Sequence, residues 1–208
     1  MRIFSAIVAL SLSLQNFSVP FRQQTVFSSA STVSVSPAHV VGQKISVPGV
    51  SNAGKISDSL YRGAQPNLAH LGELKKLGVT TIVDLRSESR HTREQEQTQA
   101  ESLGMHFVSI PVGGFNPPTS EQLAQFFLVM RQTPVQKIFV HCRYGEDRTG
   151  VFIAAYRIAF ERWSSDQAIT EMLYFGFKRH WHPAMVNYVH LLPDRIHSDP
   201  LLKSALEN

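Results

Sequence analysis

The segment Thr149–Phe160, TGVFIAAYRIAF, constrains the fold most, because it reads as a helix that is apolar on nearly every side. Such a helix has to be covered by neighbours all round, so we expect it to pack centrally. The run KIFVHC precedes it and predicts a strand in a buried sheet. The connection His141–Gly150, HCRYGEDRTG, therefore lies where a buried strand ends and the central helix begins.

Helix and strand patterns alternate through the rest of the folded region. Amphipathic spacing and capping residues predict five further helices over Leu68–Gly78, His91–Leu103, Glu121–Gln132, Asp166–Phe175 and Pro183–Leu192. β-branched runs predict strands at VTTIVDLR and HFVSI. Strands that alternate with helices imply right-handed βαβ units, so the expected fold is a single α/β domain with a mostly parallel sheet covered on both faces.

The N-terminal residues have a different composition. One Arg precedes the apolar stretch Ile3–Leu14, which is too short to span a membrane and predicts a signal peptide over residues 1–20, or alternatively an uncleaved anchor. Residues 21–51 are rich in Ser, Val, Thr and Pro and are predicted to be a weakly ordered linker. We assign residues 52–195 to the folded domain and residues 196–208 to a C-terminal tail.

The net charge and the single cysteine limit the kinds of ligand and chemistry that the chain is expected to have. The net charge is +4, but Lys and Arg are scattered without a run of four or more, so no nucleic-acid partner is indicated. A phosphorylated or acidic ligand suits this charge. The single cysteine cannot form an intramolecular disulfide and marks a free, potentially reactive thiol.

That cysteine, Cys142, opens the strand-to-helix loop. Such a loop turns backbone N–H groups and the positive end of the helix dipole toward one point, which makes a cradle for anions. The same field favours the thiolate, which is the nucleophilic form of cysteine. Arg148 presents a planar fork that fits two oxygens of a phosphoryl group. Gly145 permits the backbone reversal that the cradle needs.

Further loop residues receive narrower roles. We expect the Thr149 hydroxyl to donate to the Cys142 sulfur and His141 to order the loop by hydrogen bonds rather than act as a base. The remaining candidates for the phosphate-binding loop are its other members, Arg143, Tyr144, Glu146 and Gly150. For Glu146 we expect a place at the solvent-facing rim.

The pattern Cys-x5-Arg, with His before it and Thr-Gly after it, resembles the signature of cysteine-dependent protein tyrosine and dual-specificity phosphatases. SDSLYRGAQPN, GVTTIVDLRSE and SSDQAITEMLYFGF extend the resemblance to the small bacterial periplasmic members. It implies a central sheet of four or five strands, the periplasm as location, no metal or other cofactor, Cys142 as nucleophile and Arg148 as phosphate ligand. A lone cysteine at a strand end is otherwise read as a small buried hydrophobic residue.

One departure from the family concerns the proton donor. The family's Asp is expected in the loop IPVGGFNPPTSEQL, which contains no Asp. Asp147 is the first candidate, because the DRT ending resembles the loop of myotubularin lipid phosphatases, where this acid has the donor role. Glu121 and water are the alternatives, and Asp147 has a second interpretation as a helix residue stabilised by the dipole.

Other polar residues have two interpretations each. Arg62, Gln65, Asp84 and Arg86 lie at element ends, where they either support the phosphate pocket or form buried salt bridges. His180, His182 and His190 raise the question of a metal, but their spacing does not place them on one helical face, and we predict no metal site.

The sequence therefore predicts a phosphomonoester hydrolase that acts through a phosphocysteine, with a phosphorylated protein, foremost on tyrosine, as substrate. The enzymatic alternative is a phosphatase of inositol phosphates or other small phosphoesters. The non-enzymatic alternative is a phosphate-binding module with weak or no turnover, which the missing loop Asp motivates. Beyond an uncleaved N-terminal segment, no membrane span is expected.

Overall fold

A six-stranded sheet forms the centre of the domain in the computed structural model, which describes residues 40–132 and 136–207. The strand order is β1-β2-β3-β6-β4-β5, and β3, β6, β4 and β5 run parallel, while β1 and β2 are added antiparallel. The strands are β1 Gln43–Lys44, β2 Gly54–Lys55, β3 Leu60–Ala64, β4 Thr81–Arg86, β5 His106–Val112 and β6 Ile138–Cys142. The predicted mostly parallel sheet is confirmed, but it has six strands where four or five were expected, because the two-residue strands β1 and β2 extend one edge.

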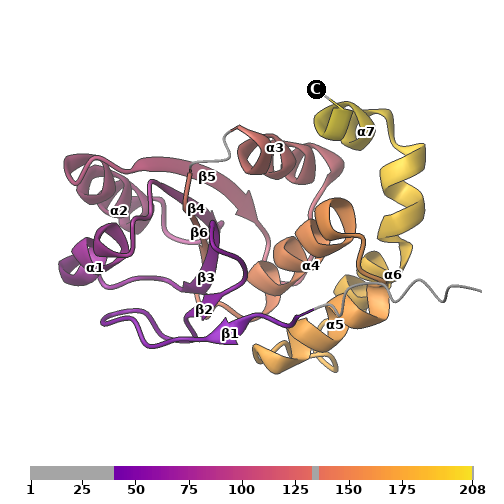
Figure 1. The fold of residues 1–208 in the computed structure, drawn as a ribbon, viewed down its shortest axis with the longest axis horizontal. Coiled ribbons are helices and arrows are strands. Elements are labelled where there is room, and N and C mark those ends of the chain that lie inside the picture. The colour runs from indigo at the N-terminus through magenta and orange to yellow at the C-terminus, as the bar shows by residue number, and fades with distance from the viewer. Residues whose placement is uncertain (1–39, 133–135, 208) are drawn as a thin grey trace, which may run out of the picture. The chain divides into compact units, whose positions relative to one another are not determined.

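Helices cover both faces of this sheet (Figure 1). The short helix α1 and the longer α2 lie on one face, and α3 to α7 lie on the other. The bounds are η1 Leu68–His70, α1 Leu71–Lys76, α2 Arg90–Ser102, α3 Ser120–Arg131, α4 Asp147–Glu161, α5 Ser165–Tyr174, α6 Pro183–Ser198 and α7 Pro200–Glu207. The two faces therefore hold separate apolar clusters, and the larger one lies under α3 to α7.

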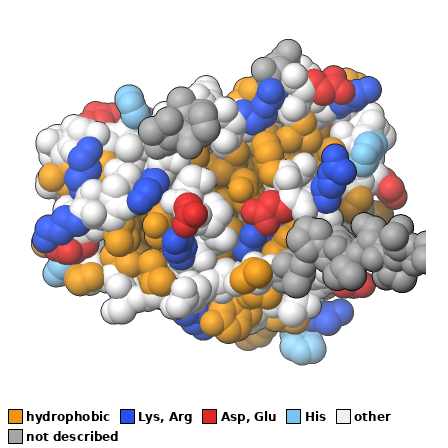
Figure 2. Space-filling view, viewed as in Figure 1, with side chains coloured by type: hydrophobic (Ala, Val, Ile, Leu, Met, Phe, Trp, Pro, Cys, Tyr) orange, Lys and Arg blue, Asp and Glu red, His pale blue; other side chains and the backbone are white. Residues whose placement is uncertain are grey.

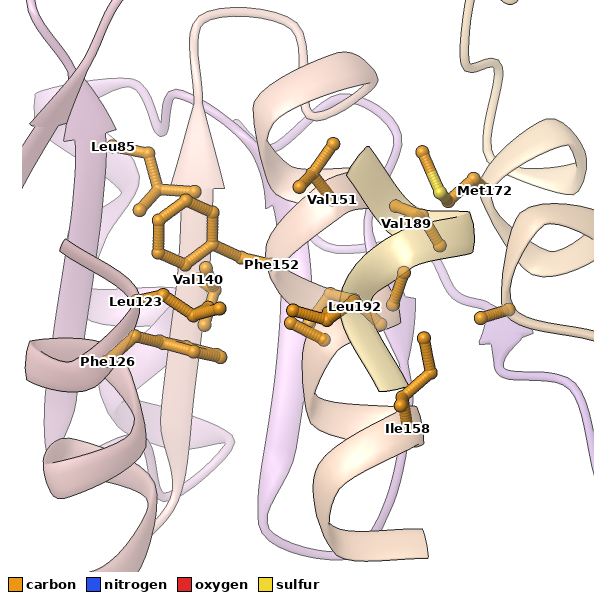
Figure 3. Packing of buried hydrophobic residues seen from close by; sticks show 14 of the residues in the cluster. Leu85, Leu123, Phe126, Val140, Val151, Phe152, Ile158, Met172, Val189 and Leu192 are labelled. Carbon is orange, nitrogen blue, oxygen red and sulfur yellow. The ribbon is translucent and has the colours of Figure 1, made fainter. Parts of the chain in front are cut away.

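The helix α4 occupies the centre of the larger cluster, as its apolar sequence predicts. Phe152 packs edge-to-face on Phe126 of α3, with ring centroids 5.1 Å apart. Figure 3 shows the Phe152 ring between Leu85 of β4 and Val140 of β6, with Leu123 and Phe126 of α3 close by. This packing fixes the start of α4 against the end of β6, and the loop between them is fixed with it.

The folded region extends beyond the predicted limits of residues 52 and 195. β1 lies before residue 52, and the apolar side chains of Val47 and Val50 are buried although Ser, Pro and Gly surround them in the sequence. A two-residue strand is too short to give a period-2 pattern, which explains why composition indicated a linker there. At the other end, α7 buries Leu202 and Ala205 where a tail was expected.

The predicted signal peptide and the first part of the predicted linker lie outside the described residues. Within residues 40–132 and 136–207, no helix combines the length and apolarity needed to cross a membrane. On the face shown in Figure 2, Lys and Arg side chains are scattered among polar and hydrophobic ones rather than gathered in one patch.

Candidate active site

The loop from Cys142 to Arg148 lies at the carboxyl edge of the parallel strands. β6 pairs with β3 up to Ala64–Cys142 and with β4 up to Asp84–His141, so the ends of three strands meet at this loop. Parallel strands place their carboxyl ends on the same side, which is where α/β folds bind ligands. Cys142 is the last residue of β6 and its side chain is buried.

Gly145 sets the path of the loop. Its φ is +68°, and a Cβ at this position would lie 2.3 Å from the carbonyl carbon of Gly63 in β3. The Gly145 carbonyl oxygen accepts hydrogen bonds from Arg62 Nη2 at 2.6 Å and Asn52 Nδ2 at 3.0 Å. Asn52 also donates to the carbonyl of Phe175, so the loop is tied to β3 and to the end of α5. The proposed reversal at Gly145 is present.

Arg148 is held by a bidentate ion pair with Glu88. Its Nη1 and Nη2 donate to the two Glu88 carboxylate oxygens at 2.8 and 2.7 Å, and Nη1 also donates to the Val112 carbonyl at 3.2 Å. The hydrogen bond from Arg148 lowers the pKa of Glu88 to about 2. No described residue accepts a hydrogen bond from Arg148 Nε. The Nε–Nη2 edge of the guanidinium is therefore available for two oxygens of a ligand.

The two loop acids have different neighbours. Asp147 Oδ1 accepts from the backbone N–H of Lys178 at 2.9 Å, and its Oδ2 lies 3.4 Å from His182 Nε2. Glu146 pairs with the Lys178 ammonium at 2.9 Å. Both acids therefore fasten the loop to the segment before α6, which accounts for two negative charges next to an anion cradle.

A buried charged cluster supports the start of the loop from below. His141 Nε2 lies 2.9 Å from Glu96 Oε1 and 3.8 Å from Asp84 Oδ1, and Arg86 bridges both carboxylates. His141 Nδ1 lies 3.4 Å from the Cys142 carbonyl oxygen. Because the Arg86 guanidinium forms ion pairs with both Asp84 and Glu96, this group is a salt-bridge network beneath the site, which agrees with the second of its two sequence-based interpretations.

Asp84, Glu96 and His141 are also close enough to share a metal ion, since one ligand atom of each falls within 4.8 Å of the others. The Arg86 guanidinium, which binds both carboxylates, places a positive charge against the same oxygens. A cation would have to displace it. The donor set therefore fits a salt-bridge network better than a metal centre.

A cavity of about 240 Å³ opens above Cys142. Arg148 and Asp147 line it together with Glu88 and His182. Its mouth carries three strongly exposed aromatic side chains, Phe115 (69%), Tyr144 (56%) and Trp181 (74%). A larger cavity of about 500 Å³ lies by the start of α6, around Arg179, His180 and His190, but neither a cysteine nor a carboxylate lines it. The cavity at Cys142 is therefore the candidate site.

The predicted site residues divide into three groups. Cys142, Arg143, Tyr144, Asp147 and Arg148 line the cavity. Gly145, Glu146, Thr149 and Gly150 belong to the same loop and helix start but are not among the residues that line it. Arg62, Asp84 and His141 lie behind it as supports.

The sequence predicts a role in the reaction for Thr149 and, as an alternative proton donor, for Glu121. The Thr149 hydroxyl is buried without a hydrogen-bond partner among the described residues, so the predicted bond to the Cys142 sulfur is not formed here. Glu121 is not among the residues lining the cavity; it lies in the first turn of α3. This leaves Asp147 as the loop carboxylate that lines the site.

Sequence reasoning missed Glu88 and the roles of Phe115 and His182. Glu88 follows β4 by two residues, and a carboxylate just beyond a strand that neighbours the loop is a usable signal. Phe115 lies in the loop that lacks the expected Asp, and an aromatic residue in a loop of this composition carries no signal of a site. The spacing of His182 from His180 and His190 raises only the question of a metal. No pattern in the sequence pairs it with Asp147, which is 35 positions away.

Comparisons with known proteins agree with this geometry. "Dual specificity protein phosphatase TpbA" from Pseudomonas aeruginosa is 32% identical over 127 residues, which cover 61% of this chain and 55% of TpbA. The aligned part thus spans about half the length of that relative. A TpbA crystal structure in complex with pTyr has a TM-score of 0.64 at 20% identity, covering 83% of this chain and all of that one.

A second solved structure has the same fold. The core catalytic domain of the PP-IP phosphatase SIW14 from S. cerevisiae, in complex with citrate, has a TM-score of 0.63 at 21% identity and covers 77% of this chain and 94% of its own. The family model PTP-NADK matches residues 39–181. Its description is "DSP-PTPase phosphatase fused to NAD+ Kinase". Since the match covers more than half of the chain, this protein belongs to that family of cysteine-dependent, dual-specificity-type phosphatase domains.

Proposed function

We propose that this protein hydrolyses phosphomonoesters through a phosphocysteine intermediate at Cys142. The observation that carries the proposal is the meeting of Cys142 and Arg148 in one cavity, with one edge of the Arg148 guanidinium unused. Glu88 holds the adjacent Nη1–Nη2 edge, so the free N–H groups keep a fixed direction. A planar fork fixed in this way suits two equatorial oxygens of a phosphoryl group.

The reaction has two displacements at phosphorus. Cys142 Sγ attacks in line, and the S–P bond forms as the P–O bond to the leaving group breaks. Arg148 and the backbone N–H groups of the loop stabilise the charge on the three equatorial oxygens. Water then attacks the phosphocysteine, the S–P bond breaks, and phosphate and the thiolate are released.

Asp147 is our proposed proton donor for the leaving oxygen. It lines the cavity next to Arg148, and the loop of residues 111–118 offers no other acid. A positioned donor contributes roughly 10²–10⁴ to the rate. In the second displacement the same carboxylate takes a proton from the attacking water.

Phosphotyrosine in a protein is the proposed substrate. Phe115, Tyr144 and Trp181 expose their rings around the cavity mouth, where they can flank the planar ring of an aryl phosphate. The second candidate is an inositol phosphate or another small phosphoester, which the basic side chains of Arg143 and Lys178 in the same wall favour. The Lys178 charge is already paired with Glu146, so we rank the aryl ester first.

The experiment measures hydrolysis of a phosphotyrosine peptide, a phosphoserine peptide, an inositol phosphate and para-nitrophenyl phosphate, with Cys142→Ser as control. We expect the phosphotyrosine peptide to give the highest kcat/KM of the physiological esters, and Cys142→Ser to abolish turnover. Trp181→Ala is expected to raise KM for the peptide more than for the inositol phosphate. If wild type and Cys142→Ser hydrolyse equally little while both bind phosphoesters, the protein is a binding module.

We also propose export to the bacterial periplasm. The apolar stretch Ile3–Leu14 behind Arg2 supports this proposal. Fractionation of cells expressing the full chain tests it, with mass spectrometry of the mature N-terminus. Recovery of full-length protein in the cytoplasm would contradict export, and full-length protein in the membrane fraction would indicate an uncleaved anchor instead.

A further inference from the structure

We propose that His182 and Asp147 act as one proton-holding pair, in which His182 supplies the proton that Asp147 passes to the leaving group. This inference rests on the proposed function and adds His182 to its machinery. His182 is the residue before α6, 34 positions after Arg148. Among the residues that line the cavity, it is the one histidine.

The position of His182 is closely fixed. The residue is only 7% exposed, and its ring contacts the rings of Phe115 and Phe177 at centroid distances of 5.3 and 6.0 Å. Its Nε2 lies 3.4 Å from Asp147 Oδ2. Its Nδ1 is buried and has no hydrogen-bond partner among the described residues. The two aromatic rings hold the buried imidazole with Nε2 near one carboxylate oxygen.

Asp147 has one carboxylate oxygen engaged and one open to a partner. Oδ1 accepts the Lys178 backbone N–H, and the next residue is the cationic Arg148. The Lys178 ammonium forms an ion pair with Glu146, and the Arg148 guanidinium forms one with Glu88. Among the described residues, His182 is thus the side chain that brings a ring nitrogen close to the free oxygen Oδ2, and the proposal has a proton pass between these two atoms.

The proton balance closes over one turnover. As the S–P bond forms and the P–O bond breaks, Asp147 gives a proton to the leaving oxygen and receives one from His182 Nε2. When water attacks the phosphocysteine, its proton goes to Asp147 and returns to His182. His182 therefore acts through Asp147 and is a positioning residue that holds the proton.

The test compares leaving groups, because a proton donor matters most for a leaving group that is strongly basic. kcat/KM is measured with phenyl phosphate and with para-nitrophenyl phosphate, whose leaving group departs without much help. We expect His182→Gln to lower kcat/KM for phenyl phosphate roughly 10²-fold and for para-nitrophenyl phosphate only a few-fold. The matched control is His180→Gln, the same change at an exposed histidine two residues away, which should alter neither value.

A double-mutant cycle with Asp147→Asn completes the test. If the two residues act as a pair, the double variant loses no more activity on phenyl phosphate than Asp147→Asn alone. Two results would contradict the proposed pairing of His182 with Asp147. One is an equal loss of kcat/KM on both substrates in His182→Gln, and the other is a double variant whose loss is the product of the two single losses. If His182→Gln does not fold, His182→Phe keeps the ring contacts and takes its place. Absence of wild-type turnover on either substrate would instead refute the proposed function.

Discussion

Arg62 is a fully buried cation that lacks an ion-pair partner among the described residues. Its guanidinium packs 4.2 Å above the Phe175 ring and donates only to the Gly145 carbonyl, while its Nε and Nη1 have no acceptor. Burial lowers the pKa of Arg62 to about 10. Glu171 and then Cys142 are the negative groups that interact favourably with this cation. The buried charge of Arg62 therefore favours an anion at Cys142, on the other side of the loop.

The first prediction follows from that charge. Arg62→Gln keeps a donor for the Gly145 carbonyl but removes the cation, so alkylation of Cys142 by iodoacetamide at neutral pH should slow roughly tenfold. Arg179→Gln removes an exposed positive charge and is expected to leave the alkylation rate unchanged. Equal rates in wild type and Arg62→Gln, with both folded, would show that the buried charge does not act on the thiolate.

The ion pair between Glu88 and Arg148 predicts a pH-dependent contribution to stability. The folded-state pKa of Glu88 is about 2, below its ordinary value of 4.5. The pair therefore stabilises the fold above about pH 4.5, and this contribution disappears as the pH falls toward 2. Because the Glu88 side chain is 44% exposed, solvent screening limits the contribution to roughly 1 kcal/mol.

Urea unfolding of wild type and Glu88→Gln measures this contribution. We expect wild type to have the larger free energy of unfolding at about pH 7 and the difference to shrink at about pH 3. Glu94→Gln changes an exposed acid in an i,i+4 pair on α2 and serves as the control for a general charge effect. A difference that stays constant with pH, or grows on acidification, would contradict the pairing.

Site residues could be predicted from the sequence where they are close together along the chain. Cys142 and Arg148 belong to one loop, so their spacing alone marks them. Glu88 and His182 reach the same cavity from the end of β4 and the start of α6. Nothing in the sequence shows that folding brings these two residues to the loop. The partners of a loop are therefore harder to predict than the loop itself.

At the scale of elements, the strand-loop-helix unit depends on the close approach of the loop to β3. A Cβ on Gly145 would meet the backbone of Gly63 and Ala64 at 2.3 to 2.5 Å, and backbone atoms cannot move aside cheaply. The positive φ adds strain for any other residue. This element is local in sequence, which is why its glycine and its anion-cradling shape were predictable.

We therefore expect Gly145→Ala to fold with a displaced loop and to lose roughly 10²-fold in kcat/KM for para-nitrophenyl phosphate. Gly72→Ala in α1 is the matched control, because a Cβ there meets nothing within 4 Å and alanine favours the helix. Its activity should equal that of wild type and its stability should not fall. Full activity in Gly145→Ala would show that the loop is not held against β3 as described.

Elements at the margins of the sheet were less predictable than those at its centre. The helices and strands from β4 to α6 have clear periodicity, and the structure confirms each with shifts of a few residues, apart from a C-terminal extension of α6 to Ser198. β1 and β2 have two residues each, and their pairing depends on contacts formed after folding. Patterns of apolar residues cannot report contacts of that kind.

At the scale of the whole domain, α7 completes the cover of the larger apolar cluster. Leu202 is fully buried, and Arg131 of α3 donates to the Ala205 carbonyl. Ser120 at the start of α3 donates to Asp199, which joins α6 to α7. The C-terminal residues are therefore part of the core rather than a tail.

Two neighbouring leucines test this packing. Leu202→Ala should lower the free energy of unfolding by about 2–4 kcal/mol, because it leaves a cavity under α7. Leu201→Ala, at a side chain that is 42% exposed, should cost less than about 0.5 kcal/mol. Chemical denaturation of both variants gives the comparison, and similar values for the two would mean that α7 is not docked on α3.

The central claim for the whole molecule is that turnover passes through a phosphorylated Cys142. Rapid acid quenching during hydrolysis of para-nitrophenyl phosphate, followed by peptide mass spectrometry, tests it most directly. We predict one phosphoryl group on the sulfur of Cys142 in wild type and none in Cys142→Ser. Turnover with the phosphoryl group on another residue, such as His141, or with no phosphoenzyme while Cys142→Ser remains active, would contradict the account.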